Sequence, residues 1–299
     1  MSDWECKELI YELKSPVHIG NGQKLGIINR TRYYIPGKTM WGAAVAKIGK
    51  ELGLDTTENK KWGNLGEFVK ENMKFTYFFI SDKKGNEVKI PKYTENGNIK
   101  YGNLSEKDFE SKYITSFASA AVEKEKGTAT DGDLHEIELI KNRTGPKEDD
   151  KVYINGYVFI DKDKFEKEDY DKEDFLKWIE ELQIGGERNY GYGKIKRDKK
   201  KNTPEEVFGN EWKTDSEDIV IEKEENKEFT PFGHILIEDE DNSHINEIRG
   251  DLEPLIGREY SGSEGQNAKF SGIALAPGSE NPFSNNEFVI DKYGFIRKK

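Results

Sequence analysis

The residues best suited to ligand binding lie between Ile184 and Lys196, in the sequence IGGERNYGYGKIK. Glycine lets a backbone pass close to a ligand and present N–H groups to anionic oxygens, tyrosine offers a stacking ring, and arginine and lysine pair with phosphates. The candidate contact residues are Gly185, Gly186, Arg188, Asn189, Tyr190, Gly191, Tyr192, Gly193 and Lys194. This combination indicates an RNA strand more than a small molecule, and a plain glycine-rich turn is the alternative that the sequence leaves open.

Charge supports a local interaction surface. The chain of 299 residues has a formal net charge of −11, which argues against a protein that coats nucleic acid generally, because such binding depends on phosphate neutralisation. Residues 184–201 reverse the sign, with seven basic side chains against Glu187 and Asp198. If RNA binds, we expect it to bind along this strip, while the acidic remainder could dock basic partner proteins.

Composition excludes several other kinds of chemistry. Cys6 is the only cysteine and there are four scattered histidines, so we expect no internal disulfide, metal site or cofactor. No apolar run approaches the roughly 18 residues needed to span a bilayer, and the N-terminal sequence is too acidic for a secretory signal. We therefore expect a cytoplasmic protein without membrane contacts.

The elements that must position the loop can be placed from periodicity and breakers. Residues 7–13 and 74–80 are expected to be strands. After the breaker Pro36-Gly37, with Thr39 as candidate N-cap, a helix carries an apolar stripe of Trp41, Ala44, Val45, Ile48 and Leu52. Residues 83–103, rich in Gly, Asn and Lys, are expected to form a long mobile excursion.

Further along, residues 114–140 contain a turn signal near Lys126-Gly127 between two alternating stretches, which predicts a hairpin. A strand over 153–160 and a strand over 192–196 flank a second helix, opened by the acidic residues 171–174, whose apolar stripe is Phe175, Trp178, Ile179 and Leu182. The order is βαββαβ with insertions, which predicts an α+β, ferredoxin-like (RNA-recognition-type) fold.

The chain is long enough for two domains. We expect the ferredoxin-like domain over 1–198, with its hairpin at about 114–140, and a polar linker over 199–217. A smaller domain over 218–299, mainly β or a second ferredoxin-like unit, follows from strand candidates at 219–222, 234–237, 269–275 and 288–290.

Three pieces of the chain, in this order, resemble the RAMP superfamily of CRISPR effector proteins. They are SPVHIGNG followed by YYIPGKTMWGAAVAK, then TATDGDLHEIELI before the strand at 153–160, and finally IGGERNYGYGKI after a helix. They look like the family's first strand and helix entry, its hairpin "thumb" and its glycine-rich loop. The segment PLIGREYSGSEGQNAKFSGIALAPG resembles the second half of two-domain RAMP subunits that cap the 5′ end of the guide RNA in type III complexes.

The resemblance implies a non-catalytic RNA-binding subunit of a type III CRISPR RNA-guided interference complex, holding CRISPR RNA at its 5′ repeat-derived handle. Its implied partners are CRISPR RNA, other RAMP backbone subunits, the large subunit and, indirectly, target RNA. A backbone subunit of the same complex is the next choice. The implied contacts add to the loop a further set of residues: His18, Gly20, Asn21, Lys24, Arg30, Arg32, Lys38 and Arg258.

The loop from Asn21 to Ile35 bears on catalysis. In the family's slicing backbone subunits this loop carries an aspartate that cleaves target RNA, whereas here it contains no acidic residue and three basic ones, Lys24, Arg30 and Arg32. We therefore expect that the protein does not slice RNA and is not an enzyme.

His18 keeps a second function open. A histidine beside a glycine-rich turn has the pKa range of a general acid or base, which would suit a metal-independent endoribonuclease that processes guide RNA. In DGDLHE, strand alternation separates Asp133 and His135 from Glu136, so a solvated hairpin is favoured over a metal site. Trp41 and Trp178 lie on apolar helix stripes, which favours core packing over base stacking.

Overall fold

The computed structural model describes residues 3–24, 27–83, 85–119, 135–168, 170–198, 204–223, 229–237, 248–259, 267–280 and 287–299. The central sheet contains β1 (Trp4–Leu13), β4 (Tyr34–Ile35), β5 (Met73–Phe75), β6 (Phe78–Ser81), β12 (Tyr153–Asp161), β13 (Glu181–Gln183) and β14 (Lys194–Arg197). Its path is β13-β14-β1-β12-β6-β4, and β5 also pairs with β12.

The predicted βαββαβ order is present in this sheet. The strands β14, β1, β12 and β6 lie side by side, and each neighbouring pair is antiparallel. The helix α1 (Gly37–Glu51) connects β1 to β5 and β6, and the helices α4 (Lys162–Lys167) and α5 (Lys172–Trp178) connect β12 to β13 and β14. With β1, β6, β12 and β14 counted as the first to fourth strands, the spatial order is fourth, first, third, second, which is that of a ferredoxin-like core.

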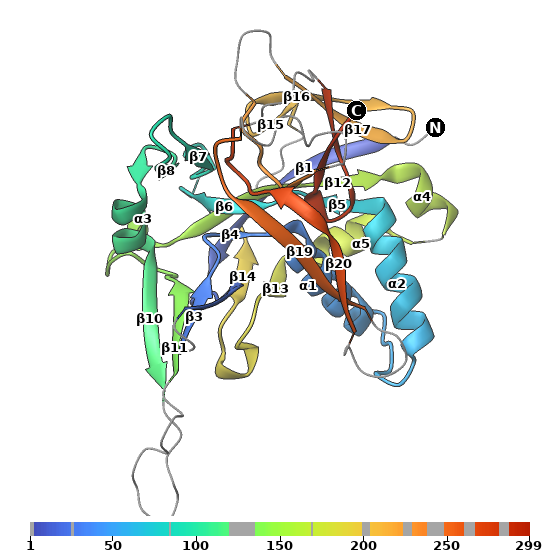
Figure 1. The fold of residues 1–299 in the computed structure, drawn as a ribbon. Helices are drawn as coiled ribbons and strands as arrows, with labels where there is room; N and C mark the ends of the chain where they lie inside the picture. The colour runs from blue at the N-terminus through green and yellow to red at the C-terminus, as the bar shows by residue number, and fades with distance from the viewer. Residues whose placement is uncertain are drawn as a thin grey trace, which may run out of the picture.

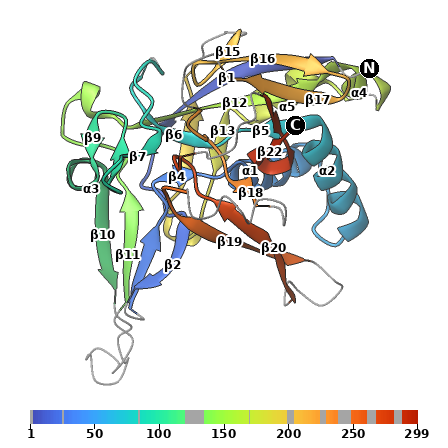
Figure 2. The same ribbon diagram turned by 45° about the horizontal axis from the view of Figure 1, so that its top comes forward.

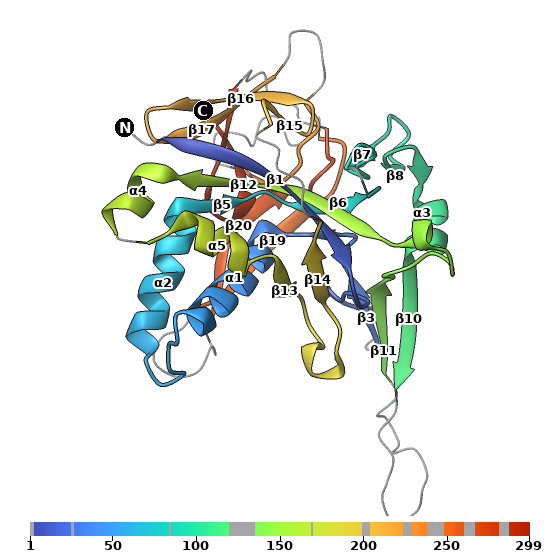
Figure 3. The ribbon, with the colours of Figure 1, turned by 180° about the vertical axis from the view of Figure 1, so that it is seen from behind.

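The central strand β12 is covered on both faces, since all nine of its residues are buried. Ile154, Val158 and Ile160 face the core that the helices close, whereas Tyr157 and Phe159 face the C-terminal strands. Figures 1 and 3 show the helices below β1 and β12 and the strands β16 and β17 above them. The period-two alternation of a strand thus separates two apolar cores.

Two details of the helical layer differ from expectation. Pro36, not Thr39, is the N-cap of α1, because the fixed φ of proline suits the residue where an extended chain enters a helix. The helix α2 (Asn59–Asn72) was not predicted, since its sequence is polar and contains two glycines. Trp62 of α2 packs so closely on Gly49 of α1 that a Cβ there would overlap its ring.

The excursion predicted over residues 83–103 is wrong in its described part, which is a small sheet. The strands β7 (Pro91–Tyr93), β8 (Ile99–Tyr101) and β9 (Leu104–Ser105) pair in sequence and lead into the helix α3 (Glu106–Tyr113). Tyr93 and Tyr101 are buried, and Tyr101 stacks on Phe109 with centroids 4.2 Å apart. The aromatic side chains of this polar segment thus form a small core, which its composition does not reveal.

The predicted hairpin is confirmed where it is described. The strands β10 (Ile114–Ser119) and β11 (His135–Ile140) are antiparallel, in the register Ile114 to Ile140, while the expected tip near Lys126-Gly127 lies outside the described residues. The hairpin extends a four-stranded sheet through β3 (Ile28–Thr31) and β2 (Gly20–Lys24), in the order β10-β11-β3-β2.

The C-terminal strands form an eight-stranded sheet, in the order β15-β16-β17-β21-β22-β18-β20-β19. The strands β17 (Asp218–Glu222), β18 (Ile235–Leu236), β20 (Asn267–Leu275) and β21 (Glu287–Ile290) match the four predicted ones; β19 (Leu252–Glu259) and β22 (Ile296–Lys298) were not predicted. The expected linker over 199–217 is wrong in part, since β15 (Glu206–Val207) and β16 (Asn210–Asp215) lie within it. Val207 is fully buried and Trp212 packs on Phe159, so this stretch joins the second core.

Candidate nucleic-acid interface

Residues 16–19 lie between the hairpin sheet and the glycine-rich loop. Val17 exchanges two backbone hydrogen bonds with Ile140 of β11, 2.8 and 3.0 Å long. The Ile19 amide donates to Thr31 Oγ1 of β3 at 2.9 Å. The HIG sequence is therefore anchored to the sheet that carries the hairpin.

The same segment holds the glycine-rich loop by its carbonyl groups. The Gly186 amide donates to the His18 carbonyl oxygen at 2.9 Å, and the Gly193 amide donates to that of Pro16 at 2.8 Å. The two sequence pieces that indicated the family are thus in direct contact. Figures 1 and 3 show the result, in which the β13–β14 hairpin and the β10–β11 hairpin extend in the same direction with β3 between them.

Glycine is required at two positions of the loop. Gly185 and Gly193 have φ of 75° and 82°, which side-chain-bearing residues rarely adopt. A Cβ at Gly185 would overlap with the His18 carbonyl oxygen, and one at Gly193 would overlap with that of Ile184. Gly191 also has a positive φ, of 86°, but open space surrounds its missing side chain.

Three glycine amides of the loop are hydrogen-bonded within the protein, which leaves them unavailable to cradle a phosphate in this conformation. Besides the donors Gly186 and Gly193, the Gly191 amide donates to the Arg188 carbonyl oxygen at 3.0 Å. The Gln183 side-chain amide closes the turn by donating to the carbonyls of Arg188 and Tyr192, at 3.0 and 2.9 Å. The hydrogen bonds of Gly186, Gly191 and Gly193 thus serve to shape the loop.

The side chains at the tip are available for that purpose. The short 3₁₀ turn Arg188–Tyr190 is exposed, and Tyr190 keeps 77% of its surface in solvent. Arg188 and Lys194 are exposed too, and neither forms an ion pair within the described part of the chain. Lys196, by contrast, pairs with Glu181 at 2.5 Å. The tip therefore combines an exposed ring, an exposed amide at Asn189 and two unneutralised cations.

A second exposed aromatic side chain lies on the neighbouring hairpin and was missed by the sequence reasoning. Phe117 of β10 is 54% exposed, and its cross-strand partner Ile137 is buried. An aromatic ring that remains in solvent on a projecting strand is available for stacking. The sequence signal was only a lone Phe in ITSFAS, where alternation does not say which face meets solvent.

Other predicted contact residues are placed differently. Arg32 is mostly buried, donating to the Tyr34 hydroxyl at 2.8 Å and pairing with Glu253 of β19 at 2.6 Å. Arg30 is 39% exposed, with Nε 3.8 Å from Glu138 Oε2. Arg32 is thus already neutralised by protein, whereas Arg30 retains access to solvent.

The β2 residues and two remote cations complete the predicted set. Gly20 and Asn21 are exposed on β2 at the edge of the hairpin sheet, and the backbone of Lys24 pairs with Ile28 at the end of that strand. Lys38 lies over the ring of Tyr293, 5.5 Å from its centroid, away from the loop. Arg258 lies on β19, opposite Ala268, and its side chain is outside the part that the structure describes.

His18 is 8% exposed, and its Nδ1 lies 2.8 Å from the Glu138 carbonyl oxygen. A buried ring held by a backbone group has a structural role that needs no substrate. The prediction of a solvated hairpin at DGDLHE involves Asp131 and Asp133, which lie outside the described residues. Within the described ranges no cluster of three His, Cys, Asp or Glu side chains suits a metal ion. Trp41 and Trp178 pack against the first core, as predicted.

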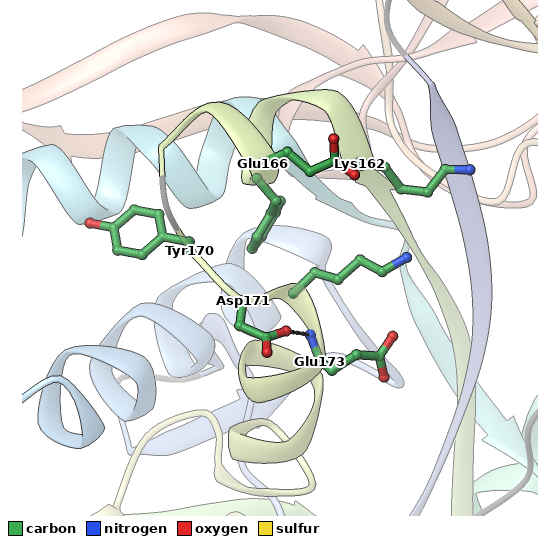
Figure 4. Close-up of a pocket in the computed structure, with 7 residues that line it drawn as sticks. Lys162, Glu166, Tyr170, Asp171 and Glu173 are labelled. Carbon is green, nitrogen blue, oxygen red and sulfur yellow. Dashed lines mark hydrogen bonds between the residues drawn. The ribbon is translucent and has the colours of Figure 1, made fainter.

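A hollow of about 400 Å³ lies between α4 and α5. Figure 4 shows Asp171 at the start of α5, where its carboxylate accepts a hydrogen bond of 2.8 Å from the Glu173 amide. The lysines that line it are paired, Lys162 with Asp3 at 2.5 Å and Lys172 with Glu5 at 2.6 Å. The polar groups of this hollow therefore cap the start of α5 or form ion pairs with other residues of the protein.

Comparison with known protein families identifies the family of this chain. The model of the RAMP superfamily matches residues 10–196, which include the HIG segment, the hairpin and the glycine-rich loop. The chain belongs to the RAMP superfamily. No curated protein matches its sequence. Among the described helices none is long and apolar enough to cross a membrane.

A solved structure with a similar fold covers almost all of this RAMP chain. A chain of the type III-B Cmr-beta complex bound to cognate target RNA and AMPPnP has a TM-score of 0.52 and 13% identity, with 98% of this chain and 99% of that chain covered. A chain of Cmr-beta bound to cognate target RNA has a TM-score of 0.49 and 14% identity, covering 91% and 85%. At these identities the first likeness shows a shared fold, which includes the C-terminal strands.

Proposed function

We propose that this RAMP protein is a non-catalytic RNA-binding subunit of a type III CRISPR effector complex, and that it holds CRISPR RNA through the tip of the β13–β14 loop. The observation that carries the proposal is the exposed group Arg188, Tyr190 and Lys194 on a loop fixed by the HIG segment. A rigid scaffold with an exposed ring and two unpaired cations matches how proteins hold single-stranded RNA.

The likeness to a chain of an RNA-bound Cmr-beta complex supports placing this function in such a complex. The bound segment would be the 5′ repeat-derived handle, and the partners would be other RAMP subunits and the large subunit, with target RNA contacted indirectly. The acidic remainder of the chain suits basic neighbours.

The absence of an acidic residue between Asn21 and Ile35 supports a holding role without slicing. A carboxylate there would be needed to assist attack by the RNA 2′-hydroxyl or to bind a metal. Incubating the purified complex with target RNA tests this: we expect no cleavage that is lost on substituting a residue of this loop. Processing of precursor guide RNA that is lost in His18→Ala would instead favour the endoribonuclease alternative.

RNA binding itself is tested by titrating labelled handle RNA at several salt concentrations. Arg188→Ala and Lys194→Ala should each weaken binding and reduce the slope of log affinity against log salt by about 0.7, the value for one phosphate contact on a single strand. Lys60→Ala, which removes an exposed cation from α2, is the matched control and should change neither quantity. Unchanged affinity in the Arg188→Ala, Lys194→Ala double variant would contradict the proposed site.

A further inference from the structure

A polar cavity of about 340 Å³ opens where three distant segments meet. These are residues 30–34 of β3 and β4, residues 91–106 with the small β7–β9 sheet, and the start of β19 with residues 276–277. Its charged lining consists of Arg30, Arg32, Glu106, Asp251 and Glu253, and four tyrosines contribute to its wall. Figure 2 shows β4, β7 and β19, one strand from each segment, which belong to three different sheets.

Several hydrogen-bond donors of this cavity are already in use. Arg32 donates to the Tyr34 hydroxyl and pairs with Glu253 at 2.6 Å. The Tyr93 hydroxyl donates to Asp251 Oδ2 at 2.5 Å, and the Tyr33 hydroxyl donates to Glu110 Oε1 at 2.6 Å. These three donors are therefore not free for an incoming ligand, whereas Arg30 retains access to solvent.

Two possible acceptors of the lining have no hydrogen-bond donor among the described residues. Glu106 forms no ion pair within the described ranges, and burial together with the neighbouring Glu110 raises the pKa of its carboxyl group. Tyr101 lines the cavity and is only 6% exposed, yet its hydroxyl makes no hydrogen bond to another described residue. The Tyr101 hydroxyl and the Glu106 carboxylate thus have no hydrogen-bond donor among the described residues, and a ligand with several donors could bond to both.

Charge decides between the possible ligands. Three carboxylates outnumber the two guanidinium groups of the lining, Arg30 also lies beside Glu138, and Arg32 is paired. A phosphate would be repelled, and the described residues contain no cluster of three metal-ligating side chains. A guanidinium fits because its planar fork presents five donors, binds carboxylates with two parallel hydrogen bonds, and is weakly hydrated.

We propose that this cavity is a docking site for an arginine side chain of a partner protein, with Glu106, Asp251 and the Tyr101 hydroxyl as its acceptors. That the partner is another subunit of an effector complex rests on the proposed function; the cavity's preference for a guanidinium does not. The site would join the hairpin side of the molecule and the C-terminal sheet to one neighbouring protein.

The proposal is tested by titrating the full chain with the capped tripeptide Gly-Arg-Gly, followed by calorimetry or NMR. The control ligand is the same peptide with citrulline, which keeps the shape but lacks the charge, and guanosine monophosphate tests for a nucleotide instead. We expect the arginine peptide to bind at least about tenfold more tightly than the citrulline peptide, because charge-assisted hydrogen bonds are the stronger ones.

Variants assign the binding to the cavity. Glu106→Gln should weaken the arginine peptide about tenfold and Tyr101→Phe about threefold, as expected for loss of a charged and a neutral hydrogen bond. Glu95→Gln removes the same charge from an exposed position in the same insertion and should have no effect. Thermal unfolding of each variant shows whether the fold is retained, and Tyr101→Phe, which removes one oxygen atom, serves if Glu106→Gln is unstable.

Two outcomes would overturn the proposal: no saturable response to the arginine peptide, or a response equal to that of the citrulline peptide. Binding of guanosine monophosphate that is weakened by Glu106→Gln would make the cavity a nucleotide site and would also overturn it. Failure of the proposed RNA-binding function looks different, since the Arg188→Ala variant would then retain RNA affinity while Glu106→Gln still lost the arginine peptide.

Discussion

Gly185 and Gly193 of the β13–β14 loop are under a stricter steric constraint than Gly191. At Gly185 and Gly193 both the backbone angle and the contact with a carbonyl oxygen exclude a side chain. At Gly191 only the angle does. Stability and ligand binding can therefore be separated by substitution within one loop.

Gly185→Ala and Gly193→Ala should each lower the free energy of unfolding by about 2 to 4 kcal/mol, combining a left-handed backbone with overpacking. Gly191→Ala, the matched control, should cost about 1 to 2 kcal/mol because only its backbone is strained. Denaturant unfolding measures all three. Equal losses at the three positions would show that the carbonyl contacts do not matter.

Tyr190→Ala should reduce handle-RNA affinity by about 1 to 3 kcal/mol, the contribution of one stacked base, and Tyr190→Phe should retain it. Because Tyr190 is 77% exposed, neither substitution should change stability. Filter binding and thermal unfolding provide the two measurements. A loss in Tyr190→Phe as large as in Tyr190→Ala would assign the effect to the hydroxyl instead of the ring.

Among the secondary-structure elements, the projecting hairpins depend on one extended segment, residues 16–19, that bonds to both. Phe117 lies on β10, and the β10–β11 hairpin extends in the same direction as the β13–β14 loop. If both hairpins contact RNA, Phe117→Ala should weaken binding by about 1 to 3 kcal/mol. Phe117→Leu, which keeps an apolar side chain without the ring, is the control in the same binding assay and should weaken binding similarly.

An ion pair connects β19 with the segment between β3 and β4. Burial opposes ionisation of Glu253, but the neighbouring His234 and Arg32 outweigh it and lower the pKa of its carboxyl group to about 2. His234 Nε2 lies 3.3 Å from Glu253 Oε2, without the alignment of a hydrogen bond, and its Nδ1 lies 2.6 Å from the Tyr77 hydroxyl oxygen. These contacts thus join Arg32 and Tyr77 to His234 and Glu253 in the C-terminal part of the chain.

Because the folded-state pKa of Glu253 is below its ordinary value of 4.5, its stabilising contribution is complete above pH 4.5 and is lost as the pH falls towards about 2. Glu253→Gln should lower the free energy of unfolding at pH 7 by about 1 to 3 kcal/mol, since it leaves Arg32 without its charge partner. It should also flatten the pH dependence between these values. An unchanged slope in this variant would assign the acid sensitivity to other groups.

At the scale of the whole molecule, the central sheet has one face covered by helices and the other by the C-terminal sheet. The second core includes Trp4, Tyr157 and Phe159 from the first sheet and Ile221 and Phe288 from the other. Each large apolar side chain buried there contributes about 1.5 to 3 kcal/mol. The two parts thus depend on each other for burial, whatever their boundaries as domains.

Residues 1–198 expressed alone should therefore expose this face, and we expect a fragment that aggregates or binds hydrophobic dyes. Size-exclusion chromatography and dye fluorescence, compared with the full chain, are the measurements. A monomeric fragment with cooperative unfolding would instead support the division into independent domains predicted from the sequence.

The βαββαβ order of the core, the hairpin and the special role of the loop glycines could be predicted from the sequence alone, because period-two alternation, helical stripes and glycine clusters are local signals. Residues whose local pattern was polar, such as those of α2 and the 91–105 sheet, were misread, since their burial depends on partners such as Gly49 and Phe109. The tertiary structure adds that the Gly186 and Gly193 amides bond to residues 16–18, that Arg32 pairs with Glu253, and that Arg188 and Lys194 form no ion pair with another described residue. A hydrogen-bond or ion-pair partner is set by the long-range meeting of segments, and no local pattern encodes that.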